Sequence, residues 1–334
     1  MVADSARWER FEFRPGDIVI STPPKSGTTW TQMLCALLIF DGPTFPAPLE
    51  LLSPWLDMLN RPVDEVYAAY ATQQHRRFIK THTPLDGVPW REEVNYVVVG
   101  RDPRDVAISM EHHLANMDFE RFLELREQAV GLDDLAELPV RREPSGDPVE
   151  RFRTFIEHDS VGGPATLASV LHHLDTAWLK RTAPNVALFH YDDYRADLPG
   201  EMLRLAHALG LPIAETRARQ LAPEASIDRM RERADEVVPS ASLGVFTSTA
   251  AFLRSGTSAS GRPGSPTTSL RATTSGWPPS CPSISPDGST AGATARASTP
   301  RIPPSPRTGP LRLARPPWSG ERPRRWTAEA GFTG

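Results

Sequence analysis

Cysteine is scarce in this chain, and long apolar runs are missing from it. Cys35 and Cys281 are its two cysteines among 334 residues, which are too few for a disulfide framework or a zinc site with four cysteine ligands. No apolar run reaches the ~18 residues that a membrane-spanning helix requires, and the polar start of the sequence is unlike a secretory signal. These absences exclude a disulfide-rich secreted protein and predict a cytoplasmic protein with no membrane partner.

The net charge of −4 is unevenly distributed along the chain. Residues 255–334 contain ten arginines and three acidic residues, a balance of +7, which leaves −11 for residues 1–254. The same segment holds 14 of the 34 prolines and lacks Lys, His, Asn, Gln, Tyr, Val and Met. Such a composition offers little for a packed core. We therefore predict a folded body followed by a disordered tail.

Strand-like segments alternate with helical patterns in the body. The expected strands are 17–22, 77–82, 95–102 and 186–194, and the expected helices are 28–40, 104–117, 166–180 and 200–209. Strands that alternate with helices indicate a mostly parallel central sheet flanked by helices, with ligands bound beyond the carboxyl ends of the strands. The predicted fold class is therefore α/β with three layers.

The loop after the first expected strand has the parts of a phosphate cradle. Gly27 lets the backbone approach an anion closely, the helix that begins at Thr28 presents unpaired N–H groups, and Lys25 adds a cation. Further donors and an aromatic ring come from Ser26, Thr29 and Trp30. Nucleotide triphosphatases require a Gly-Lys-Thr/Ser ending, whereas here the lysine precedes the glycine. The loop predicts a P-loop-like fold with an anion site, and a capped loop with a solvated lysine is the alternative.

Three motifs, in order, resemble those of the cytosolic-type sulfotransferases. PKSGTTW at 24–30 is identical to the 5′-phosphosulfate loop of that family. Residues 99–109 are similar to its 3′-phosphate segment, whose arginine at a strand end and serine eight residues later correspond to Arg101 and Ser109. KTHTP at 80–84 resembles the family's Lys-Thr-His strand end. The resemblance covers about residues 8–258, so we assign residues 1–258 to a sulfotransferase domain and residues 259–334 to the tail.

This resemblance implies transfer of the sulfuryl group of 3′-phosphoadenosine 5′-phosphosulfate (PAPS) to a hydroxyl or amine of a small acceptor. In-line transfer needs a base for the acceptor proton, which the family places at His82. Lys25 would neutralise the leaving phosphate, and Lys80 would add positive potential. No metal is required. Packing or surface roles are expected for the histidines His112, His113, His172 and His173.

The adenine of PAPS is expected beside three side chains. The family stacks the ring on its motif tryptophan, here Trp30, and on a downstream aromatic residue whose place is taken by Ile227. Stacking contributes ~1–3 kcal/mol per base, so the aliphatic replacement predicts weaker cofactor binding. Tyr191 resembles the family tyrosine near the adenine, and packing at the sheet edge is its alternative role.

The family pattern is lost close to the start of the tail. Arg254 and Gly256 resemble an Arg-Lys-Gly loop that closes over the 3′-phosphate, with Ser255 in place of the lysine. With G or C at most free third codon positions, residues 265–292 can be re-read out of frame as LTDDELARYDERVAAELPEHLARRLDRG, an amphipathic helix of the kind the family has there. We hypothesise that the tail is a family C-terminus in the wrong frame. A natural disordered tail is the alternative, and the sequence of the coding DNA decides between them.

Two other functions stay open at this point. One is a non-catalytic protein that binds PAPS or another nucleotide and closes poorly because its C-terminus is altered. The other is a P-loop kinase, although the lysine position and the lack of a magnesium-binding Asp after a strand argue against it. The tail's arginines are scattered among prolines with few aromatic residues, so no nucleic acid partner is expected.

The sequence indicates less about the acceptor than about the cofactor. Its pocket is expected from residues 48–60 and from the helix after Ser109, where the apolar candidates are Trp55, Leu56, Met58 and Met117. These side chains predict an apolar or aromatic alcohol. The oligomeric state stays open, because the family's dimer segment would lie in the altered tail.

Overall fold

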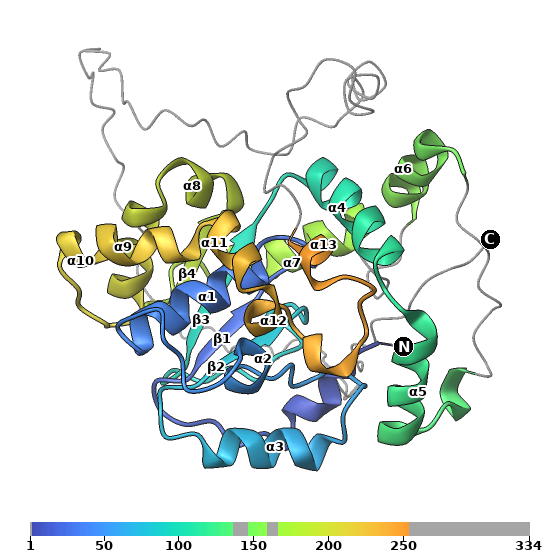
Figure 1. The fold of residues 1–334 in the computed structure, drawn as a ribbon, viewed down its shortest axis with the longest axis horizontal. Helices are drawn as coiled ribbons and strands as arrows, with labels where there is room; N and C mark the ends of the chain where they lie inside the picture. The colour runs from blue at the N-terminus through green and yellow to red at the C-terminus, as the bar shows by residue number, and fades with distance from the viewer. Residues whose placement is uncertain (1, 136–145, 159–165, 254–334) are drawn as a thin grey trace, which may run out of the picture. The chain divides into compact units, whose positions relative to one another are not determined.

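A computed structural model of the chain describes residues 2–135, 146–158 and 166–253 (Figure 1). Its sheet contains β1 (Ile18–Ser21), β2 (Phe78–Thr81), β3 (Asn95–Gly100) and β4 (Val186–His190), all parallel, in the order β2-β1-β3-β4. Each strand lies within a segment predicted from the sequence. The prediction was wrong at the end of the fourth strand, because a short helix begins at Tyr191.

The helices surround this sheet. Their bounds are α1 (Thr28–Ile39), α2 (Leu49–Leu52), α3 (Val63–Thr72), α4 (Pro103–Ala115), α5 (Phe119–Val130), α6 (Pro148–Glu157), α7 (Leu167–Leu179), α8 (Tyr191–Ala196), α9 (Leu198–Ala208), α10 (Glu215–Leu221), α11 (Ile227–Glu232), α12 (Ala234–Val237) and α13 (Thr249–Phe252). The expected helices at 28–40, 104–117, 166–180 and 200–209 correspond to α1, α4, α7 and α9. The helices α2, α8 and α10 to α13 have four to seven residues each, too few to show a clear apolar period. The longer helices α3, α5 and α6, with 10 to 12 residues, were not predicted.

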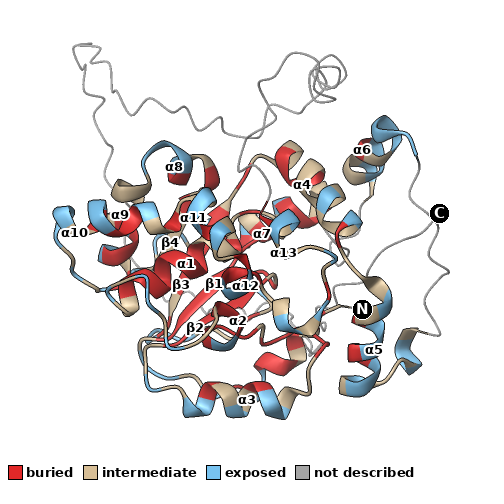
Figure 2. Cartoon of the chain, viewed as in Figure 1, coloured by how far each residue is buried: buried red, intermediate tan, exposed pale blue. Residues whose placement is uncertain are grey.

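Both faces of the sheet are buried, which explains why its strands are apolar almost throughout (Figure 2). Ile18 and Ile20 of β1 face a core formed with α1, α2 and α9 to α12, whereas Val19 faces a second core formed with α3, α7 and the N-terminal segment. In β3, Val97 and Val99 face the first core, whereas Tyr96 and Val98 face the second. The result is the three-layer arrangement predicted from the sequence.

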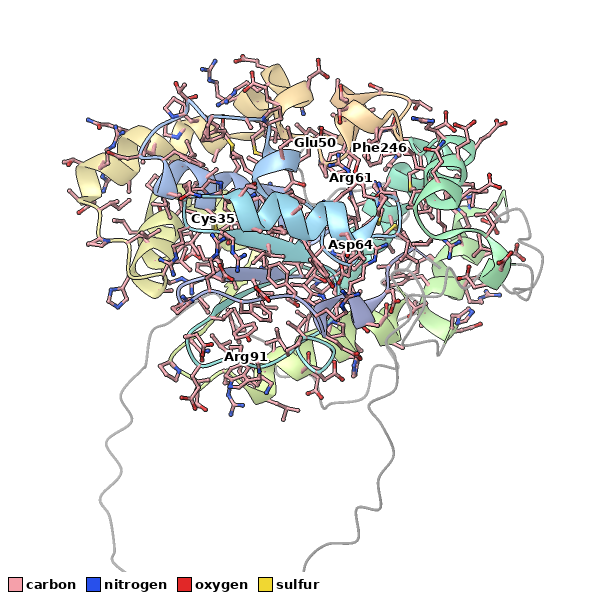
Figure 3. All side chains as sticks on the ribbon, turned by 90° about the horizontal axis from the view of Figure 1, so that it is seen from below. Cys35, Glu50, Arg61, Asp64, Arg91 and Phe246 are labelled. Carbon is pink, nitrogen blue, oxygen red and sulfur yellow. The ribbon has the colours of Figure 1, made fainter. Side chains whose placement is uncertain are left out.

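Cys35 of α1 belongs to the first core and is a packing residue (Figure 3). Its side chain is fully buried, and burial raises the pKa of the thiol to about 12. A thiol that stays protonated at neutral pH is a poor nucleophile. Cysteine chemistry at this position is therefore excluded.

The amino end of the sheet is held by a buried ion pair. Arg77 donates from Nε to Oδ1 of Asp17 at 2.8 Å and from Nη2 to Oδ2 at 2.5 Å, and the two side chains are 3% and 2% exposed. Asp17 also accepts a hydrogen bond from the backbone N–H of Arg14. Because Asp17 precedes β1 and Arg77 precedes β2, the pair fixes how these two strands align.

Replacing Asp17 with Ala should lower the free energy of unfolding by about 3–5 kcal/mol, because Arg77 would stay buried without a counter-charge. Equilibrium urea unfolding of the purified chain measures this cost. Glu215→Ala is the control, since its ion pair with Arg219 is exposed and should cost less than about 1 kcal/mol. Equal costs for the two variants would show that the buried pair does not hold the strands.

Candidate active site

The carboxyl ends of the strands open into one cavity of about 270 Å³. Its wall contains most of the site residues predicted from the sequence, namely Lys25, Gly27, Thr28, Thr29, Trp30, Lys80, His82, Arg101, Ser109, Tyr191 and Ile227. Ser26 is fully buried within the same loop and does not reach the wall. Arg254, Gly256 and the tail at 259–334 lie outside the described residues. The predicted loop over the 3′-phosphate and the hypothesis of a changed reading frame concern these residues alone.

The loop between β1 and α1 presents its backbone to this cavity. Lys25 and Gly27 have φ angles of 62° and 104°, in the left-handed region. The first N–H groups of α1 have no side-chain cap. A Cβ on Gly27 would lie 3.1 Å from Cδ2 of Tyr191, so the tight approach also requires glycine. Uncapped donors at a helix start, together with the nearby lysine, fit a bound phosphate or sulfate group.

Buried polar atoms without partners mark the same region. Ser26 Oγ, Trp30 Nε1 and Arg101 Nε find no hydrogen-bond partner in the part of the chain that the structure describes. The Arg101 guanidinium is nevertheless held in place, because Nη1 donates to the carbonyl of Lys25 at 2.9 Å and the group lies 4.1 Å from the ring centroid of Tyr191. Buried donors left unpaired cost free energy. Of these residues, Trp30 and Arg101 line the cavity, where a bound ligand can supply the missing acceptors.

His82, directly after β2, is held in one tautomer. Its Nδ1 lies 2.8 Å from the carbonyl oxygen of Thr22 and must donate to it, which leaves the lone pair on Nε2. The ring packs edge-on against Trp55, with centroids 4.7 Å apart. Burial lowers the pKa of His82 to about 3, the hydrogen bond to Thr22 opposes this shift, and the charge of Lys80 adds to it. The imidazole is therefore neutral at pH 7 and can accept a proton.

Lys80 is a buried cation in the same wall. Its side chain is 3% exposed, and its Nζ lies 4.3 Å from the ring centroid of Trp55. Burial lowers the pKa of Lys80 to about 7, although the carboxylates of Asp57 and Glu50 partly oppose the shift. The ammonium group is therefore only partly protonated at neutral pH, and a nearby anion would favour its charged form.

Asp57, which sequence reasoning missed, organises this part of the wall. The fully buried carboxylate accepts hydrogen bonds from four side chains, which are Trp8 Nε1 at 2.9 Å, Trp55 Nε1 at 2.5 Å, Thr83 Oγ1 at 2.6 Å and Thr81 Oγ1. Trp55 is thereby fixed against both His82 and Lys80. The available signal for this role was an acidic residue between apolar neighbours, in a segment 48–60 whose other acidic residue is Glu50.

The remaining wall of the cavity is mainly apolar. It includes Met58, Met110, Leu114, Met117, Phe119, Phe122, Val245, Phe246, Phe252 and Leu253. Trp55, Met58 and Met117 were predicted to line an acceptor pocket, and the structure places them in this wall. Leu56 is absent from it, because that side chain points into the core formed with α3. Such a wall suits an acceptor with a large apolar portion.

Two histidines that were expected to be structural also line the cavity. His173 is buried, and its Nε2 lies 2.9 Å from Oγ of Ser21. Because Ser21 donates its own proton to the carbonyl of Thr83, it must accept from His173. His113 reaches the cavity from α4. Neither position could be found from local sequence, since both cavity contacts arise only when distant helices pack beside the strand ends.

The lowered pKa of Lys80 can be measured directly, because the chain contains three lysines, Lys25, Lys80 and Lys180. With ¹³C-labelled lysine, one Cε resonance should titrate with a midpoint near pH 7, below which the ammonium group is charged. That resonance should be missing from the Lys80→Met variant. Three midpoints near the ordinary lysine value of about 10.4 would contradict this account of the site.

Comparison with known proteins identifies the family. A sulfotransferase domain model matches residues 15–263. A glycolipid sulfotransferase of Mycobacterium bovis (strain BCG / Pasteur 1173P2) is 48% identical over 268 residues, which cover 77% of this chain and 82% of the relative. Sulfotransferase 1E1 of Cavia porcellus is 25% identical over 229 residues, or 67% and 68% of the two chains. The chain belongs to the sulfotransferase family and is a sulfotransferase enzyme, as its three motifs predicted.

Solved structures agree with this assignment at the level of the fold. Retinol dehydratase in complex with androsterone and the inactive cofactor PAP has a TM-score of 0.58 and 23% identity, over 77% of this chain and 78% of that one. A mouse sulfotransferase complexed with PAP has a TM-score of 0.54 and 16% identity, over 75% and 78%. These neighbours confirm the predicted P-loop-like α/β fold. Among the described residues, no helix is long and apolar enough to cross a bilayer.

Proposed function

We propose that this enzyme transfers the sulfuryl group of PAPS to a hydroxyl group of an amphiphilic small molecule, with His82 as the general base. One observation carries the proposal. Lys25, Lys80, His82 and Arg101 lie at or just after the ends of three separate strands and Ser109 lies on α4, yet all five line a single cavity. The solved neighbours that contain PAP, the product form of the donor, support the choice of PAPS.

The donor's two charged ends fit two parts of the wall. The uncapped start of α1 and Lys25 would hold the 5′-phosphosulfate. Arg101 and Ser109 would hold the 3′-phosphate, where Arg101 Nε lacks a hydrogen-bond partner among the described residues. PAPS supplies the activated sulfuryl group. The chain's own contribution is to bind and orient that group and to balance its charge.

The adenine would lie beside Trp30 and Ile227, which both line the cavity. Trp30 is held by edge-on contacts with Tyr191 and Tyr194, at centroid distances of 5.3 Å and 5.5 Å. Tyr191 also lies against the Arg101 guanidinium, so it connects the adenine region with the 3′-phosphate region. This arrangement supports the predicted role of Tyr191 as a neighbour of the nucleotide.

The proton of the acceptor hydroxyl would pass to Nε2 of His82. As the acceptor oxygen bonds to sulfur, the bond from sulfur to the phosphate oxygen breaks and negative charge grows on the phosphate. Lys25 and Lys80 would balance that charge. The Thr22 carbonyl, which already accepts from Nδ1–H, would stabilise the imidazolium that forms. Bound donor anions favour protonated His82 and Lys80, so they would raise both depressed pKa values when the base is needed.

The acceptor class follows from the apolar wall and from the relatives. Methionine and phenylalanine side chains dominate the cavity beyond His82. The mycobacterial relative at 48% identity is named a glycolipid sulfotransferase. We therefore propose a glycolipid-like acceptor whose hydroxyl group reaches His82 and whose apolar portion lies on these side chains.

Gly27→Ala should weaken binding of adenosine 3′,5′-bisphosphate (PAP) by roughly tenfold or more. An alanine is strained at this φ, so the loop of the free variant would relax to another conformation. Binding of PAP would then have to restore the strained conformation, at a cost of about 1–3 kcal/mol. Isothermal titration calorimetry measures the change in Kd. Gly210→Ala, also at positive φ but with open space around its Cβ, is the control and should leave the affinity unchanged. Equal affinities for all three proteins would remove the cradle from the binding site.

His82→Asn should lower kcat by about 10²- to 10⁴-fold, because the acceptor proton would lose its base. The asparagine amide can still donate to the Thr22 carbonyl, so the Kd for PAP should change less than about threefold. Transfer of labelled sulfate from PAPS to octyl glucoside measures kcat. His172→Asn is the control, since His172 pairs with Asp86 away from the cavity wall. An unchanged kcat in His82→Asn would remove His82 as the base.

A further inference from the structure

The cavity wall contains two histidines besides His82 that the proposed chemistry does not use, His173 and His113. His113 follows Ser109 by four residues on α4, so both side chains lie on one face of the helix, and both line the cavity. Burial lowers the pKa of His113 well below its usual value, and the nearby groups Lys25, His82 and Lys80 add to the shift. The ring is therefore uncharged when the enzyme works near neutral pH.

The ring of His113 is fixed by aromatic neighbours but lacks a polar partner. Phe246 and Phe252 contact it at centroid distances of 5.4 Å and 5.7 Å. Its Nδ1 is buried and has no hydrogen-bond partner within the described ranges. The other two histidines of the wall differ, since His82 donates to Thr22 and His173 donates to Ser21. A phenylalanine would fill the same apolar space without burying a polar atom.

The chemistry of a neutral imidazole decides how His113 can act. One ring nitrogen carries a proton and the other carries a lone pair. A buried N–H without a partner is rarer in proteins than a buried acceptor without one, so Nδ1 is assigned the lone pair. The N–H then lies on Nε2, on a ring that lines the cavity. His113 can therefore donate one hydrogen bond to an oxygen atom of a bound molecule.

We propose that His113 is a specificity-determining residue, which donates a hydrogen bond to a second oxygen atom of the acceptor, close to the hydroxyl group that His82 deprotonates. This inference rests on the proposed function and narrows its acceptor class. The preferred acceptor carries neighbouring oxygens at its polar end, as a sugar does, and an apolar remainder. A simple long-chain alcohol offers only the reacting hydroxyl group and should gain nothing from His113.

Two variants and two acceptors test this assignment in the full chain. His113→Phe keeps the aromatic packing and removes the donor, whereas the amide nitrogen of His113→Gln can replace Nε2. With PAPS, His113→Phe should lower kcat/KM for octyl glucoside by about 10- to 100-fold and for 1-octanol by less than about threefold. His113→Gln should stay within about fivefold of the wild type for both acceptors. Equal losses for the two acceptors, or no recovery with Gln, would overturn the proposal.

A binding measurement separates this inference from the catalytic one. Octyl glucoside and 1-octanol are titrated into the enzyme saturated with PAP, and tryptophan fluorescence reports binding without sulfate transfer. A loss of octyl glucoside affinity in His113→Phe, but not in His113→Gln, supports the role of His113. Failure of the wild type to transfer sulfate would refute the proposed function and leave this binding result standing. The role of His113 would be overturned if the wild type and both variants had the same affinity for octyl glucoside, or if the wild type did not bind it. It would also be overturned if either variant changed the Kd for PAP more than threefold.

Discussion

Ser21 of β1 pairs with Thr81 of β2 in a parallel register, and the rest of the site depends on that pairing. Thr22 follows Ser21 and His82 follows Thr81. The carbonyl oxygen of Thr22, which fixes the imidazole, therefore lies 2.8 Å from Nδ1 of His82. A slip of one residue would turn Lys80 to the opposite face of the sheet and separate this donor from its acceptor. The buried pair of Asp17 and Arg77 secures the same register at the other end of the strands.

Burial controls charge in this cavity. Lys80 and His82 both have lowered pKa values, because burial disfavours their charged forms and the carboxylates of Asp57 and Glu50 only partly oppose this shift at Lys80. Their charged forms become favourable when an anion enters, so the cost of holding two cations close together in the free enzyme is avoided. Asp57 contributes indirectly: its carboxylate holds Trp55, and the indole supports the ammonium group on its face and the imidazole at its edge.

The sequence was most informative where chemistry and local structure coincide. β1 with its glycine loop, β2 followed by His82 and β3 followed by Arg101 could be predicted because each apolar run stops at a polar motif within a few residues. α8 was missed because its six residues continue the pattern of β4. The roles of Asp57, His113 and His173 depend on partners or neighbours far away in the chain, such as Ser21 for His173, and no local period or motif encodes such contacts. The family resemblance supplied residue roles that composition and spacing alone do not give.

Under the proposed function, α4 would contact both the donor and the acceptor. Its start is fixed by the Asp102 side chain, which accepts from the N–H of Arg104, and by a proline at its first position. From this fixed start, Ser109 lies one turn before His113, and both line the cavity, so under the proposed function a single helix would present Ser109 to the donor phosphate and His113 to the acceptor. In-line transfer requires the two substrates to be aligned within fractions of an ångström. Placing both contacts on one helix ties their separation to the helix geometry, which side-chain or loop motion changes little.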